Sequence, residues 1–524
     1  MIGWVFLSGM MGSGKSTVAA HVARIRGLPL YDLDARIEER AEMSIPRIFE
    51  TEGEAVFRKF EASEIDALLT GGEVGVVALG GGAVSHPLLR RRLLRAGTLI
   101  TLTASPETLV RRVASGGRPL LEGGDVRSRL EQLAVHRAAA YAECHGAVST
   151  DGRDPASIAQ DVLDLAARRP IAVALGTRTY AVDVAEGARH RLASCLAGLG
   201  PLGPLVVVTD RNVAPWADEV GEVLTSAGHR VLRVTLEAGE QHKNVEAVAR
   251  IWDIALQGGI DRRSVVVAVG GGVVGDLAGF AAATLMRGVR FVSLPTSLLA
   301  MVDASVGGKT GFDRAEGKNL VGAFHQPEAV FVDPDTLSTL PDEELRSGFA
   351  EVVKSAWLDS EAAVAELERD AALLCARDPD ALTRAIRMSV RLKARVVAAD
   401  EREGGARRTL NLGHTVGHAI EAAKGFSMRH GDAVALGMVA AFRLAETLGG
   451  PPRDGERMCR LLDALGLPTD LDAHLDGKTA GYLARDKKRV GEGVLFIVPG
   501  APGDVRIERL TFEEVTRRAG LPSS

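Results

Sequence analysis

Near the N-terminus, eight residues have the types and spacing of a phosphate-binding loop. The run GMMGSGKS, from Gly9 to Ser16, fits the pattern GxxxxGK[ST] and lies between an apolar run and a helical pattern. In such a loop, backbone N–H groups surround the phosphates, the lysine reaches the β- and γ-oxygens, and the hydroxyl binds Mg²⁺. The residues that we expect to bind a nucleoside triphosphate and Mg²⁺ are Gly12, Ser13, Gly14, Lys15, Ser16 and Thr17.

Acidic and basic residues farther along could complete a phosphate-transfer site. Asp32 and Asp34 would share a face on an extended segment, so that one supports the metal and the other orients or deprotonates an acceptor hydroxyl. The alternative for this pair is a helix cap or a solvated turn. The candidates for anion binding or close approach to a ligand are Arg58, Gly80, Arg118 and Arg137.

The other half of the chain has the pattern of a metal site. His414 and His418 are four residues apart, which places both imidazoles on one face of a helix. His430 and Glu351 are further candidate ligands. Because a catalytic zinc site takes three protein ligands and keeps one open position, four candidates compete for three places. The spacing alone does not choose among them.

Glycine-rich and cationic segments occur in the same half. The run GGGVVGD, from Gly270 to Asp276, follows an apolar run and precedes a helical pattern, which suits a dinucleotide pyrophosphate. The number of cations in a half with metal ligands indicates an anionic substrate that carries phosphate and carboxylate groups. The polar residues concerned are Asp303, Lys309, Lys318, Asn319, Lys354, Lys393, Arg407 and Asn411.

The elements that must position these residues indicate an α/β chain with two unrelated halves. Residues 1–168 alternate apolar runs with helical patterns, which predicts a parallel sheet, and the phosphate-binding loop and the candidate phosphate-transfer residues make this a P-loop kinase domain. Strands are expected at 4–8, 74–79 and 98–102, and Pro170 should stop the last helix. Residues 171–340 predict a dinucleotide-binding α/β subdomain. Residues 341–524 predict a mostly helical metal-binding subdomain, with helical patterns up to Leu465.

Length, charge and cysteine content limit the class of protein. A chain of 524 residues suggests about three domains. The near balance of 63 basic and 68 acidic residues argues against binding to nucleic acid or to an anionic membrane. Residues 265–286 are apolar, but they contain Asp276 and a glycine turn, so a buried strand and helix fit better than a membrane span. Four scattered cysteines and an N-terminus without a basic segment favour a soluble, cytoplasmic protein.

Residues 1–168 resemble shikimate kinase. The resemblance depends on the motifs GMMGSGKST, DLD, FR, GGG, RPLL and R-x3-Y. It implies that an Mg·ATP γ-phosphoryl group moves to the 3-hydroxyl of shikimate, which Asp34 positions, with Lys15 at the phosphates. The other implied roles are shikimate binding by Asp34, Arg58, Gly80 and Arg137, closure over ATP by Arg118, and support of Mg²⁺ by Asp32 beside Ser16.

Residues from about 171 to 524 resemble 3-dehydroquinate synthase. The motifs include EAGEQHKN, GGGVVGDLAGFAAATLMRG, DASVGGKTG, GKNLVGAFHQP, FAEVVK, LNLGHTVGHAIE, HGDAV and DKK. The resemblance implies that Zn²⁺ or Co²⁺ is held by Glu351, His414 and His430, with His418 beside the substrate. It also implies a homodimer through this half, in which Arg287 contacts the phosphate in a neighbouring subunit.

The same resemblance implies cofactor and substrate contacts. NAD would be bound by Glu240, Lys243, Gly272, Val273, Val274, Gly275, Asp276, Thr296, Ser297, Lys309, Lys318, Thr336, Leu337, Ser338 and Thr339. The heptulosonate phosphate would be bound by Asp303, Lys309, Asn319, Lys354, Lys393, Arg407, Asn411 and one of Lys487 or Lys488. The catalytic group would comprise Lys309, Lys354, Lys393, Asn411 and His418. In the implied reaction a secondary hydroxyl is oxidised by NAD⁺ at the metal, phosphate leaves, the hydride returns, and an aldol step closes the ring.

Together the two resemblances predict a bifunctional enzyme that acts on small molecules. It would convert 3-deoxy-D-arabino-heptulosonate 7-phosphate to 3-dehydroquinate, and shikimate to shikimate 3-phosphate. Two alternatives stay open. The second half could be another sugar-phosphate cyclase or a polyol dehydrogenase that uses His418 as a ligand. The first half could be a nucleotide-sensing module without kinase activity, although the intact Lys15, Asp34, Arg58 and Arg137 argue against this.

The scarcity of lysine agrees with these assignments. The sequence has 11 lysines against 52 arginines. A compact ammonium group is not replaceable by a planar guanidinium at many phosphate and substrate sites, so a lysine kept in such a sequence marks a candidate site. The lysines that fall at the predicted positions are Lys15, Lys243, Lys309, Lys318, Lys354 and Lys393, with Lys487 and Lys488 sharing a seventh.

Overall fold

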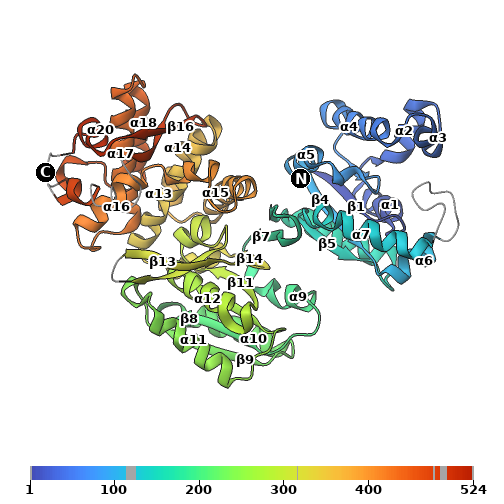
Figure 1. The fold of residues 1–524 in the computed structure, drawn as a ribbon, viewed down its shortest axis with the longest axis horizontal. Coiled ribbons are helices and arrows are strands. Elements are labelled where there is room, and N and C mark those ends of the chain that lie inside the picture. The colour runs from blue at the N-terminus through green and yellow to red at the C-terminus, as the bar shows by residue number, and fades with distance from the viewer. Residues whose placement is uncertain (1–2, 114–124, 315–316, 476–477, 484–492, 522–524) are drawn as a thin grey trace. The chain divides into compact units, whose positions relative to one another are not determined.

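The computed structural model divides into two compact units, Met1–Asp183 and Val184–Ser524 (Figure 1). It describes residues 3–113, 125–314, 317–475, 478–483 and 493–521. Three predicted site residues, Arg118, Lys487 and Lys488, lie outside these ranges. The boundary between the units falls within strand β7 (Tyr180–Val184), which pairs antiparallel with β6 (Ile171–Val173). In the part of the chain that is described, no helix is both long enough and apolar enough to cross a membrane.

The first unit is built on a parallel five-stranded sheet with the order β2-β3-β1-β4-β5. Its strands are β1 (Trp4–Gly9), β2 (Leu30–Asp32), β3 (Val76–Ala78), β4 (Gly97–Thr103) and β5 (Gly146–Ser149). The three strands that the sequence predicted are therefore confirmed. Strand β1 is buried along its whole length, as expected for a parallel strand that is covered on both faces.

Helices cover both faces of this sheet. They are α1 (Lys15–Arg26), α2 (Leu33–Ala41), α3 (Ile45–Thr51), α4 (Glu54–Gly71), α5 (Pro87–Ala96), α6 (Pro106–Val113), α7 (Val126–Ala142) and α8 (Pro155–Arg168). Alternate residues of β1 enter two separate cores, because successive side chains of a strand point to opposite faces. Val5 and Leu7 pack with α1 and α8, whereas Trp4 and Phe6 pack with α2, α4 and α5.

The strand order of the first unit reverses at β1. The chain leaves β1 through α1 toward β2 and β3 on one side, and β4 and β5 lie on the other side. In open parallel sheets, ligands bind at the carboxyl ends of the strands at such a switch in strand order. The predicted phosphate-binding loop follows β1 directly and therefore lies at this switch point.

The second unit contains five adjacent strands that pair in parallel, in the order β14-β11-β10-β8-β9. They are β8 (Leu205–Asp210), β9 (Val231–Leu236), β10 (Val265–Gly270), β11 (Arg290–Pro295) and β14 (Ala329–Val332). The helices among them are α9 (Leu192–Ala197), α10 (Ala214–Ser226), α11 (Val245–Gln257) and α12 (Gly272–Thr284). The apolar stretch 265–286 is thus mainly a buried strand, a glycine turn and a helix, as predicted.

A two-stranded hairpin lies against helix α12. It consists of β12 (Lys309–Arg314) and β13 (Gly317–Phe324), which pair antiparallel. A Cβ added at Gly279 of α12 would overlap the Thr310 side chain of β12. The absence of a side chain at Gly279 therefore lets helix and hairpin approach closely, which fixes β12 beside the start of α12.

The rest of the second unit is mostly helical, as predicted. Its helices are α13 (Asp342–Asp359), α14 (Glu361–Cys375), α15 (Pro379–Ala399), α16 (His414–Ala423), α17 (His430–Thr447), α18 (Pro452–Ala464) and α20 (Phe512–Arg518). An antiparallel hairpin, β15 (Val494–Pro499) and β16 (Val505–Leu510), lies between α18 and α20 in the sequence and was not expected. Helices α13, α16 and α17 carry the four candidate metal ligands.

Two candidate active sites

The phosphate-binding loop connects β1 to α1. Gly9 has φ +140°, and a Cβ on it would overlap the carbonyl oxygen of Leu102. Gly14 is the N-cap of α1 and makes no side-chain cap, so a phosphate can interact with the first N–H groups of the helix. Nζ of Lys15 donates to the carbonyl oxygens of Gly9 and Met10 at 3.0 and 3.1 Å. The Lys15 ammonium is therefore held against the loop in which we expect the phosphates to bind.

Asp32 lies next to Ser16 at the start of α2. The Ser16 hydroxyl donates to Oδ2 of Asp32 at 2.7 Å, and Oδ1 of Asp32 accepts from the N–H groups of Asp34 and Ala35 at 3.1 and 3.4 Å. The expectation of an extended segment with both aspartates on one face is wrong, because the chain enters α2 at Leu33. Asp32 caps the helix with one oxygen and contacts the predicted Mg²⁺-binding hydroxyl with the other.

The predicted shikimate-binding residues converge on the glycine triplet after β3. A Cβ at Gly80 would lie 2.8 Å from Oδ1 of Asp34, and one at Gly82 would overlap the guanidinium of Arg58. Nη1 of Arg137 donates to the carbonyl oxygen of Gly81 at 2.8 Å. A carboxylate and two guanidinium groups therefore surround backbone that carries no side chains. This arrangement suits a small, polyhydroxylated acid.

The electrostatic environment of Asp34 suits a proton acceptor. Desolvation by the surrounding protein raises the pKa of Asp34, and the charge of Lys15 partly opposes this shift. A general base works best when its pKa is close to the working pH. The raised pKa therefore favours proton uptake by Asp34 from a hydroxyl at this place.

Glu61 is a further residue of this site that the sequence patterns did not single out. It lies on α4, is only 1% exposed, and accepts a hydrogen bond of 2.5 Å from Nη1 of Arg58. Its other oxygen has no hydrogen-bond partner among the described residues. Burial raises the pKa of Glu61 to about 7, although Arg58 acts in the opposite direction. The spacing of three between Arg58 and Glu61 on a helix was the signal that could have identified it.

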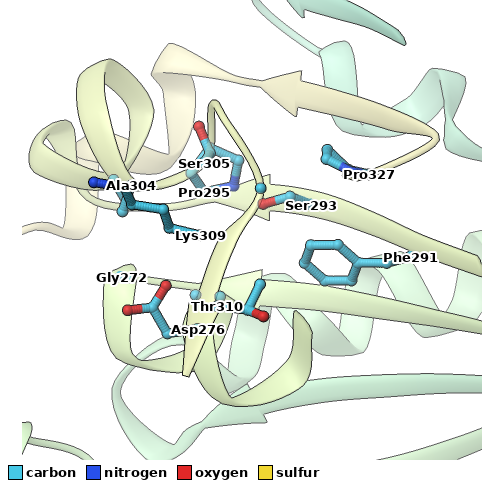
Figure 2. Close-up of a pocket in the computed structure, with 15 residues that line it drawn as sticks. Gly272, Asp276, Phe291, Ser293, Pro295, Ala304, Ser305, Lys309, Thr310 and Pro327 are labelled. Carbon is cyan, nitrogen blue, oxygen red and sulfur yellow. The ribbon is translucent and has the colours of Figure 1, made fainter. Parts of the chain in front are cut away.

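In the second unit, a hollow of ≈ 360 Å³ lies at the N-terminus of α12 (Figure 2). Figure 2 shows Asp276, Lys309 and Ser305 toward one end of it and Phe291 and Pro327 toward the other. The N–H of Thr296 donates to the carbonyl oxygen of Gly270 at 3.0 Å, which joins the end of β11 to the glycine turn. The predicted residues that line the hollow are Gly272, Gly275, Asp276 and Lys309.

Lys243 connects α12 to the β12–β13 hairpin. Its Nζ lies 2.6 Å from Oδ2 of Asp276 and donates to Oδ1 of Asn319 at 2.6 Å. The lysine is buried, so an ammonium at this place requires both partners. Burial also raises the pKa of Asp276, and Lys243 counteracts that shift. These contacts bring together three residues that lie far apart in the sequence.

Several predicted substrate-binding cations are paired with acidic residues. Lys393 contacts Asp303, Lys309 contacts Glu403, and Glu403 also accepts from Nδ2 of Asn411 at 2.9 Å. Lys354 and Lys393 are not solvated surface charges, since they are 2% and 7% exposed. The other predicted cation of this group, Arg407, is buried and donates to the carbonyl oxygen of Gly307 at 3.3 Å.

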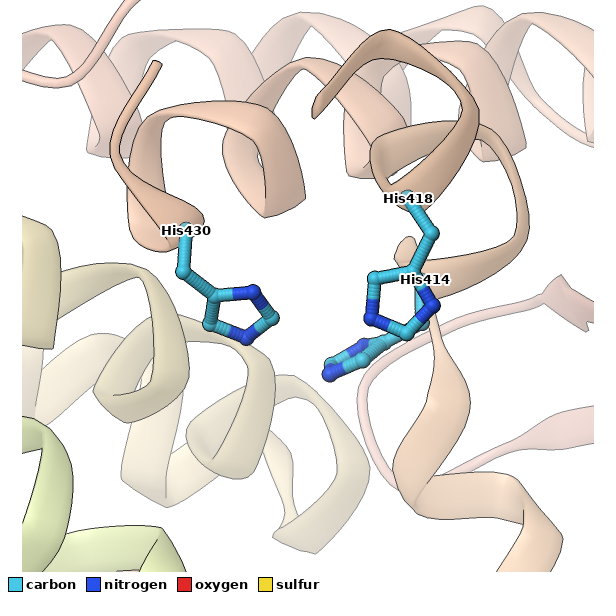
Figure 3. Close-up of side chains that lie close together, drawn as sticks. All are labelled: His414, His418 and His430. Atoms are coloured by element: carbon cyan, nitrogen blue, oxygen red, sulfur yellow. The ribbon is translucent and has the colours of Figure 1, made fainter. Parts of the chain in front are cut away.

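The three histidines point toward one another from α16 and the start of α17 (Figure 3). The nitrogens that His414, His418 and His430 can offer lie within 4.8 Å of one another. Oε1 of Glu351 lies 3.5 Å from Nε2 of His414 and 4.0 Å from Nε2 of His430. That oxygen is buried and accepts no hydrogen bond from a described residue. A divalent cation would supply the missing partner, so the residues fit a metal ion.

The protonation state of His414 also fits metal binding. Burial, followed by the charge of Lys354, lowers the pKa of His414 well below its ordinary value, so the imidazole is neutral. Its Nδ1 faces the carbonyl oxygen of Leu412 at 3.2 Å, which leaves Nε2 directed at Glu351. His418, by contrast, is exposed on the side of the cluster that solvent reaches.

Two groups of predicted residues lie apart from the hollow and the histidine cluster. Arg287 is exposed, has φ +68°, and its side chain forms no hydrogen bond or ion pair with a described residue. Thr336, Leu337, Ser338 and Thr339 form the short helix Pro334–Thr339, where the hydroxyl of Thr339 accepts from Nε1 of Trp216 at 3.0 Å. None of these residues, nor Glu240, is among the residues that line the hollow.

The folds and sites define two classes of enzyme, a P-loop phosphotransferase and a dinucleotide- and metal-binding enzyme with a parallel sheet. The shikimate kinase family model matches residues 11–167. The N-terminal and C-terminal models of 3-dehydroquinate synthase match residues 233–347 and 348–489. The chain belongs to the 3-dehydroquinate synthase family and carries a shikimate kinase domain in front of it. It is therefore a bifunctional shikimate-pathway enzyme, a kinase joined to a phosphate-eliminating lyase.

Known proteins agree with this assignment. The 3-dehydroquinate synthase of Citrifermentans bemidjiense is 46% identical over 344 residues, which are 65% of this chain and 95% of that protein. The structure of 2-epi-5-epi-valiolone synthase from Streptomyces hygroscopicus subsp. jinggangensis, with NAD⁺ and Zn²⁺ bound, is 27% identical with a TM-score of 0.58 and covers 65% of this chain and 95% of its own. A 2-deoxy-scyllo-inosose synthase structure shares the fold, with 24% identity, a TM-score of 0.59, and coverage of 67% and 99%.

Proposed function

We propose that the first unit phosphorylates shikimate with the residues that meet at the glycine triplet and the phosphate-binding loop. The convergence of Lys15, Asp34, Arg58 and Arg137 on these two loops carries the proposal. The loop and Lys15 would hold the ATP phosphates, and the two arginines would hold the shikimate carboxylate. Asp34 would orient the 3-hydroxyl and accept its proton.

Mg²⁺ belongs to the same proposal. The Ser16 hydroxyl and Oδ2 of Asp32 are 2.7 Å apart, and hydroxyl and carboxylate oxygens are the ligands that Mg²⁺ prefers. When bound, Mg²⁺ neutralises charge on the transferred phosphate. Ser16 and Asp32 would hold it directly or through water, because Mg²⁺ usually retains several water ligands.

For the second unit, we propose that Glu351, His414 and His430 hold Zn²⁺ or Co²⁺. Glu351 offers an unpaired buried oxygen, and both histidines direct Nε2 toward it. His418 would remain on the substrate side of the cluster, since it is exposed. A bound divalent metal polarises a hydroxyl group of the substrate. Lys354, which is paired with Glu351, would bring a positive charge to the same place.

NAD is proposed to bind with its pyrophosphate at the N-terminus of α12. The turn from Gly270 to Gly272 has no side chains, and the helix start has no side-chain cap, so its N–H groups suit an anion. Bound NAD⁺ accepts and later returns one hydride. Lys309 would reach both cofactor and substrate, because it lines the hollow and also contacts Glu403, the partner of Asn411.

We further propose that the enzyme is a cytoplasmic homodimer. Strand β13 exposes Leu320, Val321 and Phe324, three large apolar side chains in one short strand. Such a surface in a soluble protein favours contact with another chain. Light scattering of the purified protein tests this, and a monomer at every concentration would reject it.

Two separate assays test the proposed activities. Shikimate and Mg·ATP should yield ADP, and heptulosonate 7-phosphate with NAD⁺ should release inorganic phosphate. An absence of shikimate-dependent ADP release would reject the kinase proposal and support a nucleotide-sensing module. Phosphate release without formation of 3-dehydroquinate would instead indicate a different cyclase.

A further inference from the structure

One carboxylate, Glu421, contacts both the histidine cluster and the β12–β13 hairpin. It lies on α16 and is 4% exposed. Its Oε2 lies 3.5 Å from Nδ1 of His430. Its Oε1 accepts a hydrogen bond of 2.7 Å from Nζ of Lys318 in β13. Lys318 comes 103 residues before Glu421 in the sequence, and His430 comes after it. The fold therefore brings the three residues together.

The contact with His430 determines which ring nitrogen is available to a metal. A carboxylate at Nδ1 favours the proton on that nitrogen, so Nε2 keeps its lone pair. Nε2 is the atom that lies 4.0 Å from Oε1 of Glu351. His414 has the same arrangement, with the carbonyl oxygen of Leu412 at Nδ1. Metal-binding histidines are commonly oriented by an acceptor for their second N–H group.

The contact with Lys318 extends toward the dinucleotide hollow. Lys318 and the next residue, Asn319, have partners on different elements, Glu421 of α16 for Lys318 and Lys243 for Asn319. Asn319 accepts from Lys243, which in turn contacts Asp276 of α12. Two sets of polar contacts, which are joined by the backbone of β13 between Lys318 and Asn319, therefore connect His430 with the helix at which the pyrophosphate is expected.

We propose that Glu421 is a positioning residue that orients His430 toward the metal and, through Lys318, fixes the hairpin beside the metal site. The inference depends on the proposed metal site. Replacement of the carboxylate by an amide keeps the shape of the side chain but removes the charge that holds both the Nδ1–H group and the ammonium. Loss of such an outer partner typically weakens metal binding ~10–100-fold.

Cobalt titration of the full-length, metal-stripped protein tests this proposal, because the visible spectrum of Co²⁺ reports ligand geometry as well as binding. We expect Glu421→Gln to bind Co²⁺ ~10–100-fold more weakly and with an altered spectrum. The matched control is Glu344→Gln, since Glu344 accepts from Nε of Arg429, next to His430, but does not contact the imidazole. Wild-type affinity in Glu421→Gln, or an equal loss in Glu344→Gln, would overturn the proposal.

Two further measurements keep the outcomes distinct. If the wild-type protein itself takes up no Co²⁺, the proposed metal site fails, whereas wild-type uptake with an unaffected Glu421→Gln rejects only the role of Glu421. If Glu421→Gln does not fold, long-range ¹H–¹⁵N spectra of the histidines in the wild-type Zn²⁺ form decide. We expect His430 to be metallated at Nε2 and protonated at Nδ1, and metallation at Nδ1 would overturn the proposal.

Discussion

At the residue scale, acidic side chains orient the basic groups that are expected to meet substrate or metal. Glu61 holds Arg58, Asp303 holds Lys393, and Glu403 holds Lys309. A buried ammonium is costly without such a partner, which applies to Lys393 at 7% exposure. The acids beside Arg58 and Lys309 limit the positions of less buried cations. Such pairs suit sites whose substrates are anions, because the cation is already fixed before the anion arrives.

The ionisation of Glu61 should make the stability of the kinase unit depend on pH. Its folded-state pKa of about 7 exceeds the ordinary value of 4.5, so between these pH values the folded unit holds a proton that the unfolded chain has lost. The stabilisation from this group is full below pH 4.5, falls as the pH rises, and is lost above about 7. Glu61→Gln, which cannot ionise, should flatten that slope. The kinase unit is identified as the thermal unfolding transition whose midpoint temperature rises when shikimate and ATP are added. That midpoint is measured against pH in the wild-type protein and in Glu61→Gln, and parallel slopes would contradict the prediction.

Substitution of single histidines should separate metal ligand from substrate neighbour. We expect His430→Ala to weaken metal binding by more than the ~10–100-fold that is typical when a hydrogen-bond partner of a ligand is removed. His418→Ala should keep its metal but lose synthase turnover, because the exposed ring lies on the substrate side. Metal content after dialysis and steady-state kinetics measure the two effects. Loss of metal in His418→Ala alone would reverse the assignment.

At the element scale, the start of α12 organises the second unit. The helix begins at a glycine turn between β10 and β11, lines the hollow, and packs against β12 through Gly279. Two glycines of this helix, Gly275 and Gly279, therefore have different structural roles. Gly275 lines the hollow and has open space where a Cβ would lie, whereas a Cβ at Gly279 would overlap Thr310.

Alanine at these two glycines should have opposite effects. Gly275→Ala should leave the protein folded, and more stable by up to ~1 kcal/mol from helix propensity, but weaken NAD binding by narrowing the hollow. Gly279→Ala should destabilise the unit by ~1–3 kcal/mol, because the helix and hairpin must move apart. Urea unfolding and calorimetric titration with NAD measure both properties. The interpretation fails if Gly275→Ala is the less stable variant.

Across the whole molecule, the described candidate residues of the two proposed reactions fall into separate units. The residues proposed for phosphate transfer lie within Met1–Asp183, and those proposed for cofactor and metal binding within Val184–Ser524. The two reactions are not consecutive steps of the pathway, so direct transfer of an intermediate between the sites is not required.

Independent sites predict independent inactivation. Removal of the transition metal with a chelator, followed by assay in excess Mg²⁺, should abolish the synthase reaction and leave the kinase reaction unchanged. Lys15→Ala should have the reciprocal effect, since it removes the ammonium from the phosphate-binding loop only. Both rates are measured in the same preparations. A parallel loss of both activities in either experiment would show coupling between the units.

The parts of the sites that depend on local chemistry could be predicted from the sequence. The loop from Gly9 to Ser16, the turn at Gly270 and the histidines of α16 are recognisable because a short segment must supply special backbone geometry or ligands at fixed spacing. The parallel strands were predictable too, since burial on both faces requires nearly continuous apolar runs. Among the scarce lysines, Lys243, Lys354 and Lys393 are buried, and the site roles assigned to the lysines stay predictions.

Which of these groups meet depends on the fold. Glu61 and Glu421 stand out because of the partners they contact, and the contact of Glu421 with Lys318 spans 103 residues. The extended segment expected at Asp32 was replaced by a helix start, because Asp32 caps α2. Burial, unpaired oxygens and ring orientation depend on packing between distant segments, and no local pattern records them. The sequence therefore determined which chemistry this protein can perform, and the fold decided which residues can perform it together.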